Sequence, residues 1–197
     1  MDITDPQLQI PAGLRTAEFV LRPITADDAA LDHAAVMESR SYLRLWEQSS
    51  WPEDDFTVEA NREDLVDLEQ RHAARRAYTY TLLDPGESRC LGCVYLFPPT
   101  ATFLARSTVS PLARSTWAEQ EAVVYFWTRS SAMDSGLDAR LLERLRGWLA
   151  GDWGLTRTVF VTHEQFTQQV GLLEATDLAP AFELVEPGKP GKYLVYG

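Results

Sequence analysis

Phe126-Trp-Thr-Arg-Ser-Ser-Ala-Met-Asp-Ser-Gly-Leu-Asp-Ala-Arg-Leu-Leu142 is the stretch that decides the fold. It continues an apolar run that begins at Ala122, and such a nearly unbroken run is typical of a strand buried in the middle of a sheet. A helix is predicted after it by apolar residues at helical spacing, namely Leu137, Leu141, Leu142, Leu145, Trp148 and Leu149. The stretch therefore predicts a central strand, a polar loop and an amphipathic helix.

The flanking sequence predicts alternating strands and helices on both sides of this unit. Turn residues at 84–87 separate two apolar runs and indicate a β-hairpin, whereas residues 98–120 have no clear pattern and are predicted to be a long loop. The other predicted elements are a strand at 17–24, one helix from 25 to about 46, a helix at 57–76, a strand at 158–162, a helix at 166–173, and strands at 181–185 and 193–196. This order favours a mixed sheet with helices on its faces.

Length and composition favour one globular domain spanning residues 1–197. Hydrophobic residues make up 45% and charged residues 24% of the chain, which is ordinary globular composition. The formal charge of −11 would repel a phosphate backbone, so we expect no nucleic-acid partner. With no long apolar run and no export signal, we expect a cytoplasmic protein without a membrane partner.

No spacing of His, Cys or acidic residues predicts a metal site. Cys90 and Cys93 are the two cysteines, and no second pair of thiols exists to complete a four-ligand zinc site. Three residues apart on a predicted strand, they are expected to face opposite sides of the sheet as buried, inert thiols.

The order of elements, opening with Leu21-Arg-Pro-Ile-Thr-Ala-Asp-Asp28, resembles the GNAT superfamily of acyl-CoA-dependent N-acetyltransferases over nearly the whole chain. The resemblance implies an α/β (mixed α+β) domain with a mostly antiparallel mixed sheet of about seven strands, splayed in the middle and flanked by about four helices. It implies transfer of an acetyl or acyl group from acyl-CoA to an amine of a small molecule or protein, without a metal. It also allows a homodimer.

The cofactor motif of that superfamily is Arg or Gln, two residues, Gly, one residue, then Gly or Ala, after the central strand. Its backbone N–H groups and the following helix N-terminus bind a pyrophosphate. Here Gly136 occupies the first Gly position, whereas Met133 and Asp138 replace the other two signature residues. Asp138 is better explained as a first-turn acid that stabilises the helix than as a cofactor-binding residue. The resemblance implies that the cofactor contacts Trp127, Arg129, Ser130, Ser135, Gly136, Leu137 and Arg140.

The resemblance also implies catalytic and substrate residues. Glu121, near the start of the central strand, is the candidate base, and Tyr193 is the candidate acid that protonates the leaving thiolate. Trp46, Trp51 and Glu53 are candidates for binding a cationic amine, because aromatic faces and carboxylates attract ammonium groups. The alternatives are an exposed acid at a strand end, a tyrosine packed in the core, and tryptophans that anchor a loop.

Two functions therefore remain open from the sequence. The first is an acyl-CoA-dependent N-acetyltransferase. The second is a scaffold of this kind that has lost cofactor binding through Met133 and Asp138 and serves as a ligand-binding or protein-interaction module. Free backbone N–H groups in the loop 130–138 would favour the first, and side chains that fill the cleft would favour the second.

Overall fold

The computed structural model describes residues 3–197, which form one mixed sheet with helices on both faces. The nine strands lie in the order β1-β2-β3-β4-β6-β7-β9-β8-β5. Every neighbouring pair is antiparallel except β6 and β7, which are parallel. The strands are β1 Leu14–Arg15, β2 Val20–Pro23, β3 Tyr78–Leu83, β4 Cys90–Phe97, β5 Thr108–Pro111, β6 Ala122–Thr128, β7 Thr158–His163, β8 Pro180–Val185 and β9 Tyr193–Tyr196.

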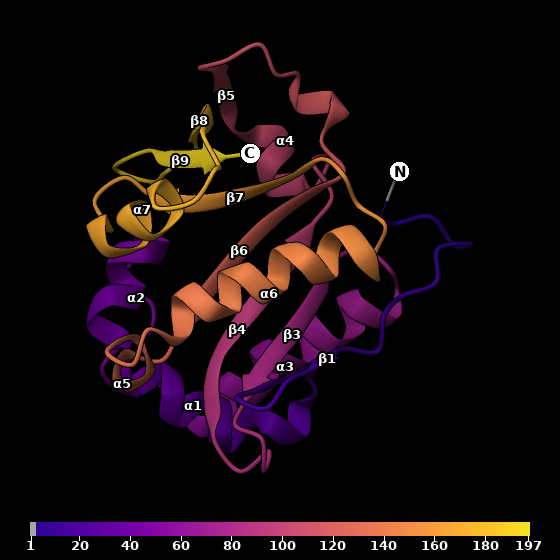
Figure 1. The fold of residues 1–197 in the computed structure, drawn as a ribbon. Coiled ribbons are helices and arrows are strands. Elements are labelled where there is room, and N and C mark those ends of the chain that lie inside the picture. The colour runs from indigo at the N-terminus through magenta and orange to yellow at the C-terminus, as the bar shows by residue number, and fades with distance from the viewer. Residues whose placement is uncertain (1–2) are drawn as a thin grey trace.

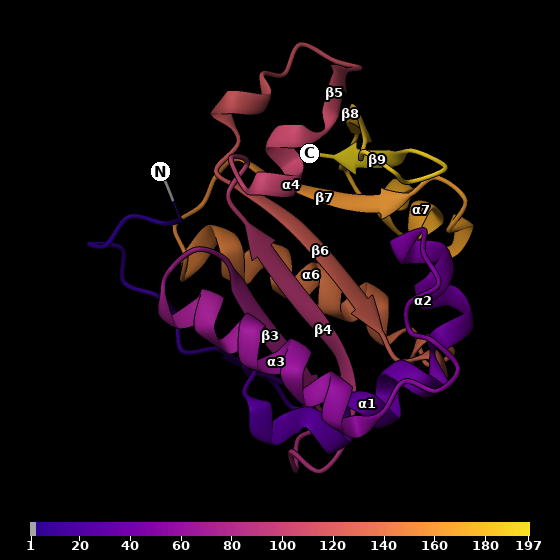
Figure 2. The same ribbon diagram turned by 180° about the vertical axis from the view of Figure 1, so that it is seen from behind.

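Helices cover the two faces of the sheet unequally. The α-helices are α1 Ala29–Glu38, α2 Arg40–Glu47, α3 Val58–Ala73, α4 Thr102–Arg106, α5 Ser130–Met133, α6 Leu137–Gly151 and α7 Thr167–Glu174. Helix α6 crosses one face (Figure 1), and α1 and α3 cover the opposite face (Figure 2). Two short 3-10 helices, η1 Ala26–Asp28 and η2 Trp117–Glu119, complete the described elements.

The two faces hold two separate hydrophobic cores. On one face, the apolar stripe of α6 packs on Tyr80, Phe126 and Phe160 of the sheet. On the other, residues of α1, α2 and α3 pack on side chains such as Tyr125 and Trp127. Because successive side chains of a strand point to opposite faces, β6 supplies residues to both cores and is buried along its whole length.

Strands β6 and β7 pair only over their first three residues. The register is Ala122 with Thr158, Val123 with Val159 and Val124 with Phe160. Beyond Val124 the two strands diverge, as Figure 2 shows, and β7 stays paired with β9 as far as His163. The edge of β6 from Tyr125 to Thr128 is therefore left without a strand neighbour, which confirms the predicted splay in the middle of the sheet.

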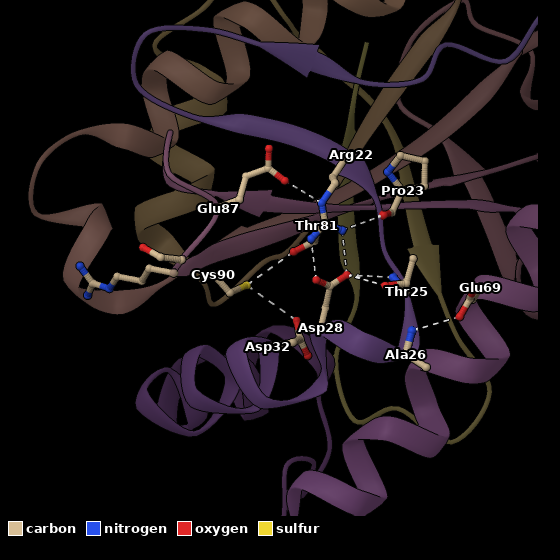
Figure 3. A network of polar contacts seen from close by, with 12 residues as sticks. Arg22, Pro23, Thr25, Ala26, Asp28, Asp32, Glu69, Thr81, Glu87 and Cys90 are labelled. Atoms are coloured by element: carbon tan, nitrogen blue, oxygen red, sulfur yellow. Dashed lines mark hydrogen bonds and ion pairs between the residues drawn. The ribbon is translucent and has the colours of Figure 1, made fainter.

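A buried ion pair fixes the chain between β2 and α1. Arg22 Nη1 and Nη2 donate to the two carboxylate oxygens of Asp28 at 2.9 and 2.7 Å. Asp28 also accepts from the backbone N–H of Thr25 at 2.9 Å, so the carboxylate caps η1 (Figure 3). The guanidinium neutralises a carboxylate that is only 4% exposed. This pair sets the direction in which α1 leaves the sheet.

One turn later, Asp32 joins three elements in the core. Its Oδ2 accepts from Nδ2 of Asn61 on α3 at 3.0 Å, and its Oδ1 accepts from the Cys90 thiol on β4 at 3.8 Å, as Figure 3 shows for Cys90. Asn61 also donates to the carbonyl of Ala29 at 3.1 Å. Burial raises the pKa of Asp32 from its usual 3.8 to about 6. Asp32 thus connects α1 to α3 and β4 through hydrogen bonds. When its carboxyl is charged, its burial lowers the stability of the folded chain.

The predicted α/β class, hairpin, central strand and long helix are confirmed, and four predictions are wrong in detail. The single helix at 25–46 is broken at Ser39, which is 1% exposed and accepts a hydrogen bond from the loop after β6. The predicted loop 98–120 contains α4, β5 and η2. Nine strands replace about seven because β1 and β5 extend the edges of the sheet. Seven α-helices replace about four because α4 and α5 are short and α1 and α2 are separate.

The cysteines are buried free thiols as expected, but their predicted placement on opposite faces is wrong. Both belong to the same core. A register shift pairs Leu82 with Gly92 and Leu83 with Cys90, so Leu91 is an extra residue on β4. This bulge reverses the alternation and brings both thiols to one face.

Two structural features are absent from residues 3–197. No helix in that range combines the length and the apolar character needed to cross a membrane. Within the same range, no group of three or more His, Cys, Asp and Glu side chains could hold a metal ion.

Candidate functional site

A pocket of about 450 Å³ lies on the face of the sheet covered by α2 and α3. Its walls come from these helices, from β4, β6 and β9, and from the turn after β8. The lining residues are Trp46, Glu47, Trp51, Asp64, Asp67, Leu68, Arg71, Tyr95, Phe97, Phe103, Tyr125, Glu186 and Tyr193. Seven of these thirteen are aromatic and four are acidic, so the pocket combines π-faces with negative charge.

The pocket opens where β6 leaves β7. Tyr125 directly follows Val124, the last residue of β6 that pairs with β7. Tyr193 of β9 pairs with His163 at the far end of β7, and the rings of Tyr125 and Tyr193 meet edge to face with centroids 6.3 Å apart. A molecule in the pocket therefore lies beside the splayed edge of β6.

Two polar atoms in the wall of the pocket have no hydrogen-bond partner among the described residues. They are the Tyr125 hydroxyl and Trp46 Nε1, on side chains whose residues are 7% and 6% exposed. The two rings are perpendicular, with centroids 6.1 Å apart. Because buried polar groups are nearly always hydrogen-bonded, these two atoms indicate a place for water or for polar groups of a ligand.

The charges of the pocket do not cancel. Glu47 Oε1 accepts from Lys189 Nζ at 2.6 Å, and Asp67 is paired with Arg71. Asp64 and Glu186 have no ion-pair partner within residues 3–197. Burial and repulsion from Glu47 raise the pKa of Glu186 to about 7. The pocket therefore carries an excess of negative charge that a cation would neutralise.

Side chains of the protein itself contact the splayed edge of β6. Gln169 of α7 donates through Nε2 to the carbonyl of Phe126 at 2.9 Å, and the hydroxyl of Tyr42 on α2 donates to the carbonyl of Thr128. Tyr42 also stacks on Phe166 with centroids 5.3 Å apart. These contacts bring α2 and α7 together over the edge that a pantetheine arm would otherwise pair with.

The loop after β6 is likewise hydrogen-bonded to Glu38, the last residue of α1, and to Ser39, which follows α1. The N–H of Ser130 donates to Ser39 Oγ at 3.0 Å, and the N–H of Ser131 donates to Glu38 Oε1 at 3.2 Å. Arg129 pairs with Glu38 at 2.5 Å, and its hydrogen bonds lower the pKa of Glu38 to about 2. Neither loop N–H is available to a pyrophosphate in this conformation.

The N-terminus of α6 carries the protein's own carboxylate. Gly136 takes the left-handed conformation, with φ of 70°, immediately before the helix. Asp138 is 6% exposed, and its Oδ1 accepts from the N–H of Ala139 at 2.9 Å. Gln168 of α7 donates to Asp138 Oδ2. A pyrophosphate here would meet a buried carboxylate, so the N-terminus of α6 does not fit the phosphates of CoA in this conformation.

The structure brings three of the predicted site residues together in the pocket, namely Trp46, Trp51 and Tyr193. Glu53 is not among the lining residues and bonds to Ser50. Glu121 lies at the other end of β6, where its Oε2 accepts from the N–H of Thr156 at 2.7 Å. These contacts do not place Glu121 beside the pocket, and its role as a base stays a prediction.

The predicted cofactor residues line neither the aromatic and acidic pocket nor a second, smaller one, and most of them make contacts within the chain. Arg140 bonds to Glu18 at 3.0 Å and to the carbonyl of Ser135 at 2.9 Å. Leu137 and Trp127 are buried in the two cores, with Trp127 Nε1 donating to the Tyr95 hydroxyl at 3.2 Å. Their contacts with a cofactor stay predictions, together with those of Arg129, Ser130, Ser135, Gly136 and Arg140.

Sequence reasoning did not select Glu47, Asp64 and Glu186 as site residues. Glu47 lies between Trp46 and Trp51 in the sequence, and this position beside two predicted site residues could have identified it. Asp64 lies among many acids of the exposed face of α3, and Glu186 precedes a Pro-Gly turn, so neither stands out in the sequence. Only the fold brings these three carboxylates to one cavity.

The sequence matches no protein-family model and no curated protein. Solved structures do match over nearly the whole chain. A protein described as a putative ribosomal-protein-serine acetyltransferase, from Vibrio cholerae, is 16% identical, with 93% of this chain and 95% of that chain covered and a TM-score of 0.70. Ribosomal-protein-S5-alanine acetyltransferase from Vibrio fischeri is 17% identical, with 94% and 95% covered and a TM-score of 0.67. The microcin C7 self-immunity acetyltransferase MccE, in complex with acetyl-CoA and AMP, is 11% identical, with 95% and 96% covered and a TM-score of 0.68.

Proposed function

The chain has the fold of the GNAT-family acetyltransferases, and from this premise we propose that it is an N-acyltransferase. The co-substrate is acetyl-CoA or another acyl-CoA, and the acceptor is an amine of a small molecule or of a protein. The acceptor binds in the aromatic and acidic pocket, where Trp46, Trp51 and Tyr193 contact it together with Tyr125 and Glu186.

The position of Tyr125 is the observation that supports this proposal most strongly. It is the first residue of β6 beyond the paired segment, and it lines the pocket. An amine held in the pocket would therefore lie at the point where the unpaired edge of β6 begins. Acyl transfer needs little more than this proximity and a group that accepts the ammonium proton.

Glu186 is suited to accept that proton. A carboxylate with a pKa of about 7 is half-charged at neutral pH, and it is therefore a stronger base than an ordinary carboxylate. The partnerless hydroxyl of Tyr125 lies in the same wall and can donate to a polar group of a ligand. Tyr193 is less suited to act as an acid, because its hydroxyl already donates to the carbonyl of Glu47 at 3.2 Å.

A second candidate is favoured by the contacts that close the cleft. Gln169 and Tyr42 bond to the β6 carbonyls, Glu38 binds the loop, and Asp138 lies at the helix N-terminus. In this reading the scaffold has lost acyl-CoA binding and the same pocket serves a ligand-binding or protein-interaction module. Both candidates use the pocket, and they differ only in whether CoA binds.

Calorimetric titration of acetyl-CoA separates the two candidates. We would titrate the natural protein, Asp138→Asn and Asp138→Gly, because Asn removes the charge with little change of shape and Gly removes the side chain. Micromolar binding by the natural protein is the result expected of a transferase. Silence from the natural protein with binding by both variants would identify a degraded cofactor site, and silence from all three would refute acyl-CoA transfer.

A further inference from the structure

We propose that the pocket binds a linear aliphatic diamine, with one ammonium group at Glu186 and the other at Asp64. This inference rests on the proposed function, because it names the class of amine that the proposed acceptor pocket takes. It concerns binding to the pocket itself and therefore holds for either candidate function.

The count of charges in the pocket supports a ligand with two positive charges. Of the four acidic side chains, Glu47 is neutralised by Lys189 and Asp67 by Arg71. Glu186 and Asp64 remain, and among the described residues neither forms an ion pair; Lys189, which pairs with Glu47, also attracts Glu186 but cannot balance both charges. A monoamine would leave one of these carboxylates without a counter-charge, whereas a diamine would supply one to each.

The two carboxylates come from different elements of the pocket wall. Glu186 follows β8 and lies near Tyr125 and Tyr193, while Asp64 lies on α3. Separate positions favour a ligand whose charges are separated by an apolar chain. The aromatic rings that line the same pocket, among them Trp46 and Phe97, give such a methylene chain an apolar surface and give ammonium groups π-faces.

The partnerless Tyr125 hydroxyl is an independent indication of a ligand. It belongs to a residue that is 7% exposed and lines the pocket, and it makes no hydrogen bond to any described residue. Its oxygen can accept from an ammonium group at Glu186, which is close enough to Tyr125 to affect its ionisation. The hydroxyl and the carboxylate thus form a binding position for one end of the diamine.

The test is calorimetric titration of the full-length protein with putrescine, with butylamine as the monoamine of equal chain length, and without any acyl-CoA. We expect putrescine or its five-carbon homologue cadaverine to bind about tenfold tighter than butylamine, since a second ion pair is formed. Glu186→Gln and Asp64→Asn should each weaken diamine binding by about tenfold. Butylamine has a single ammonium group, so only one of the two variants should change its binding. Glu63→Gln, which removes a neighbouring acid of α3 outside the pocket, should change neither.

Equal affinity for diamine and monoamine, or equal loss in Glu63→Gln and Asp64→Asn, would overturn the inference, because the attraction would then come from overall charge alone. Circular dichroism of each variant checks that it is folded. Since no acyl-CoA is present, a failure of acetyl transfer leaves this result unaffected. Conversely, an absence of diamine binding would overturn this inference and leave the proposed transfer to another amine unaffected.

Discussion

Replacing Asp32 by Asn should stabilise the protein above pH 6. Burial raises the pKa of Asp32 from 3.8 to about 6, so ionisation of this group is harder in the folded chain than in the unfolded chain. Below pH 3.8 the carboxyl is protonated in both the folded and the unfolded chain, and the folded chain has its full stability. As the pH rises from 3.8 through 6, the unfolded chain ionises more readily, so the free energy of unfolding falls. The shift of about two pH units corresponds to roughly 3 kcal/mol at neutral pH, and about half of it develops between pH 5 and 7.5.

Asparagine is neutral throughout this range, so Asp32→Asn removes the penalty. The variant keeps an oxygen that accepts from Asn61, but its amide group then faces the Cys90 thiol in place of an acceptor. That mismatch costs about 1 kcal/mol, which leaves a net gain of about 2 kcal/mol at pH 7.5.

The assay is urea unfolding of the natural protein and the variant at pH 5 and pH 7.5. We expect the variant's advantage to grow by about 1.4 kcal/mol between these values. Asp55→Asn, which changes an exposed acid outside this network, should show no such growth. A difference between the natural protein and Asp32→Asn that is the same at both pH values would refute the reasoning.

Three further predictions concern single side chains. Gly92→Ala should lower the free energy of unfolding by more than about 2 kcal/mol in urea unfolding, because Gly92 has φ of 150° and the new Cβ would lie 2.1 Å from the carbonyl oxygen of Trp127. Asp28→Asn should lower the free energy of unfolding by about 2 kcal/mol at pH 7 and by less towards pH 3. Burial opposes the ionisation of Asp28, yet hydrogen bonds from Arg22 and Thr25 lower its pKa. The stability that the charged carboxylate contributes is therefore lost as the pH falls below 3.8. Tyr125→Phe should leave thermal stability unchanged and weaken amine binding about tenfold, because the ligand loses one hydrogen bond; Tyr193→Phe should lower stability by about 1 kcal/mol through the lost bond to Glu47.

Local patterns in the sequence predicted the elements that bury apolar surface. The run from Ala122 to Thr128 and the stripe of α6 place β6 and α6 correctly, because both patterns report burial directly. The break at Ser39 was not predictable from local patterns, because Ser39 is buried and accepts a hydrogen bond from Ser130, 91 residues away. The bulge at Leu91 was missed for the same reason, since it depends on the register with β3.

The candidate site was predictable in part. Trp46 and Trp51 were selected because aromatic residues beside acids suit a cationic ligand, and the pocket contains both. Glu186 could not be selected, because its importance comes from burial near Glu47, which only the packing of the turn after β8 creates. The replacement of the motif residues by Met133 and Asp138 was visible in the sequence, but the hydrogen bonds of Gln168 and Gln169 to the cleft were not.

The most direct test of the proposed function is the release of free CoA thiol from acetyl-CoA by the purified protein in the presence and absence of putrescine. We predict release that depends on the amine, saturates with it, and falls about a hundredfold in Glu186→Gln, which removes the proposed base from a pocket that still folds. Release that is independent of amine, or none above spontaneous hydrolysis with any amine tested, would contradict the account and leave the pocket as a binding site on a scaffold that no longer transfers acyl groups.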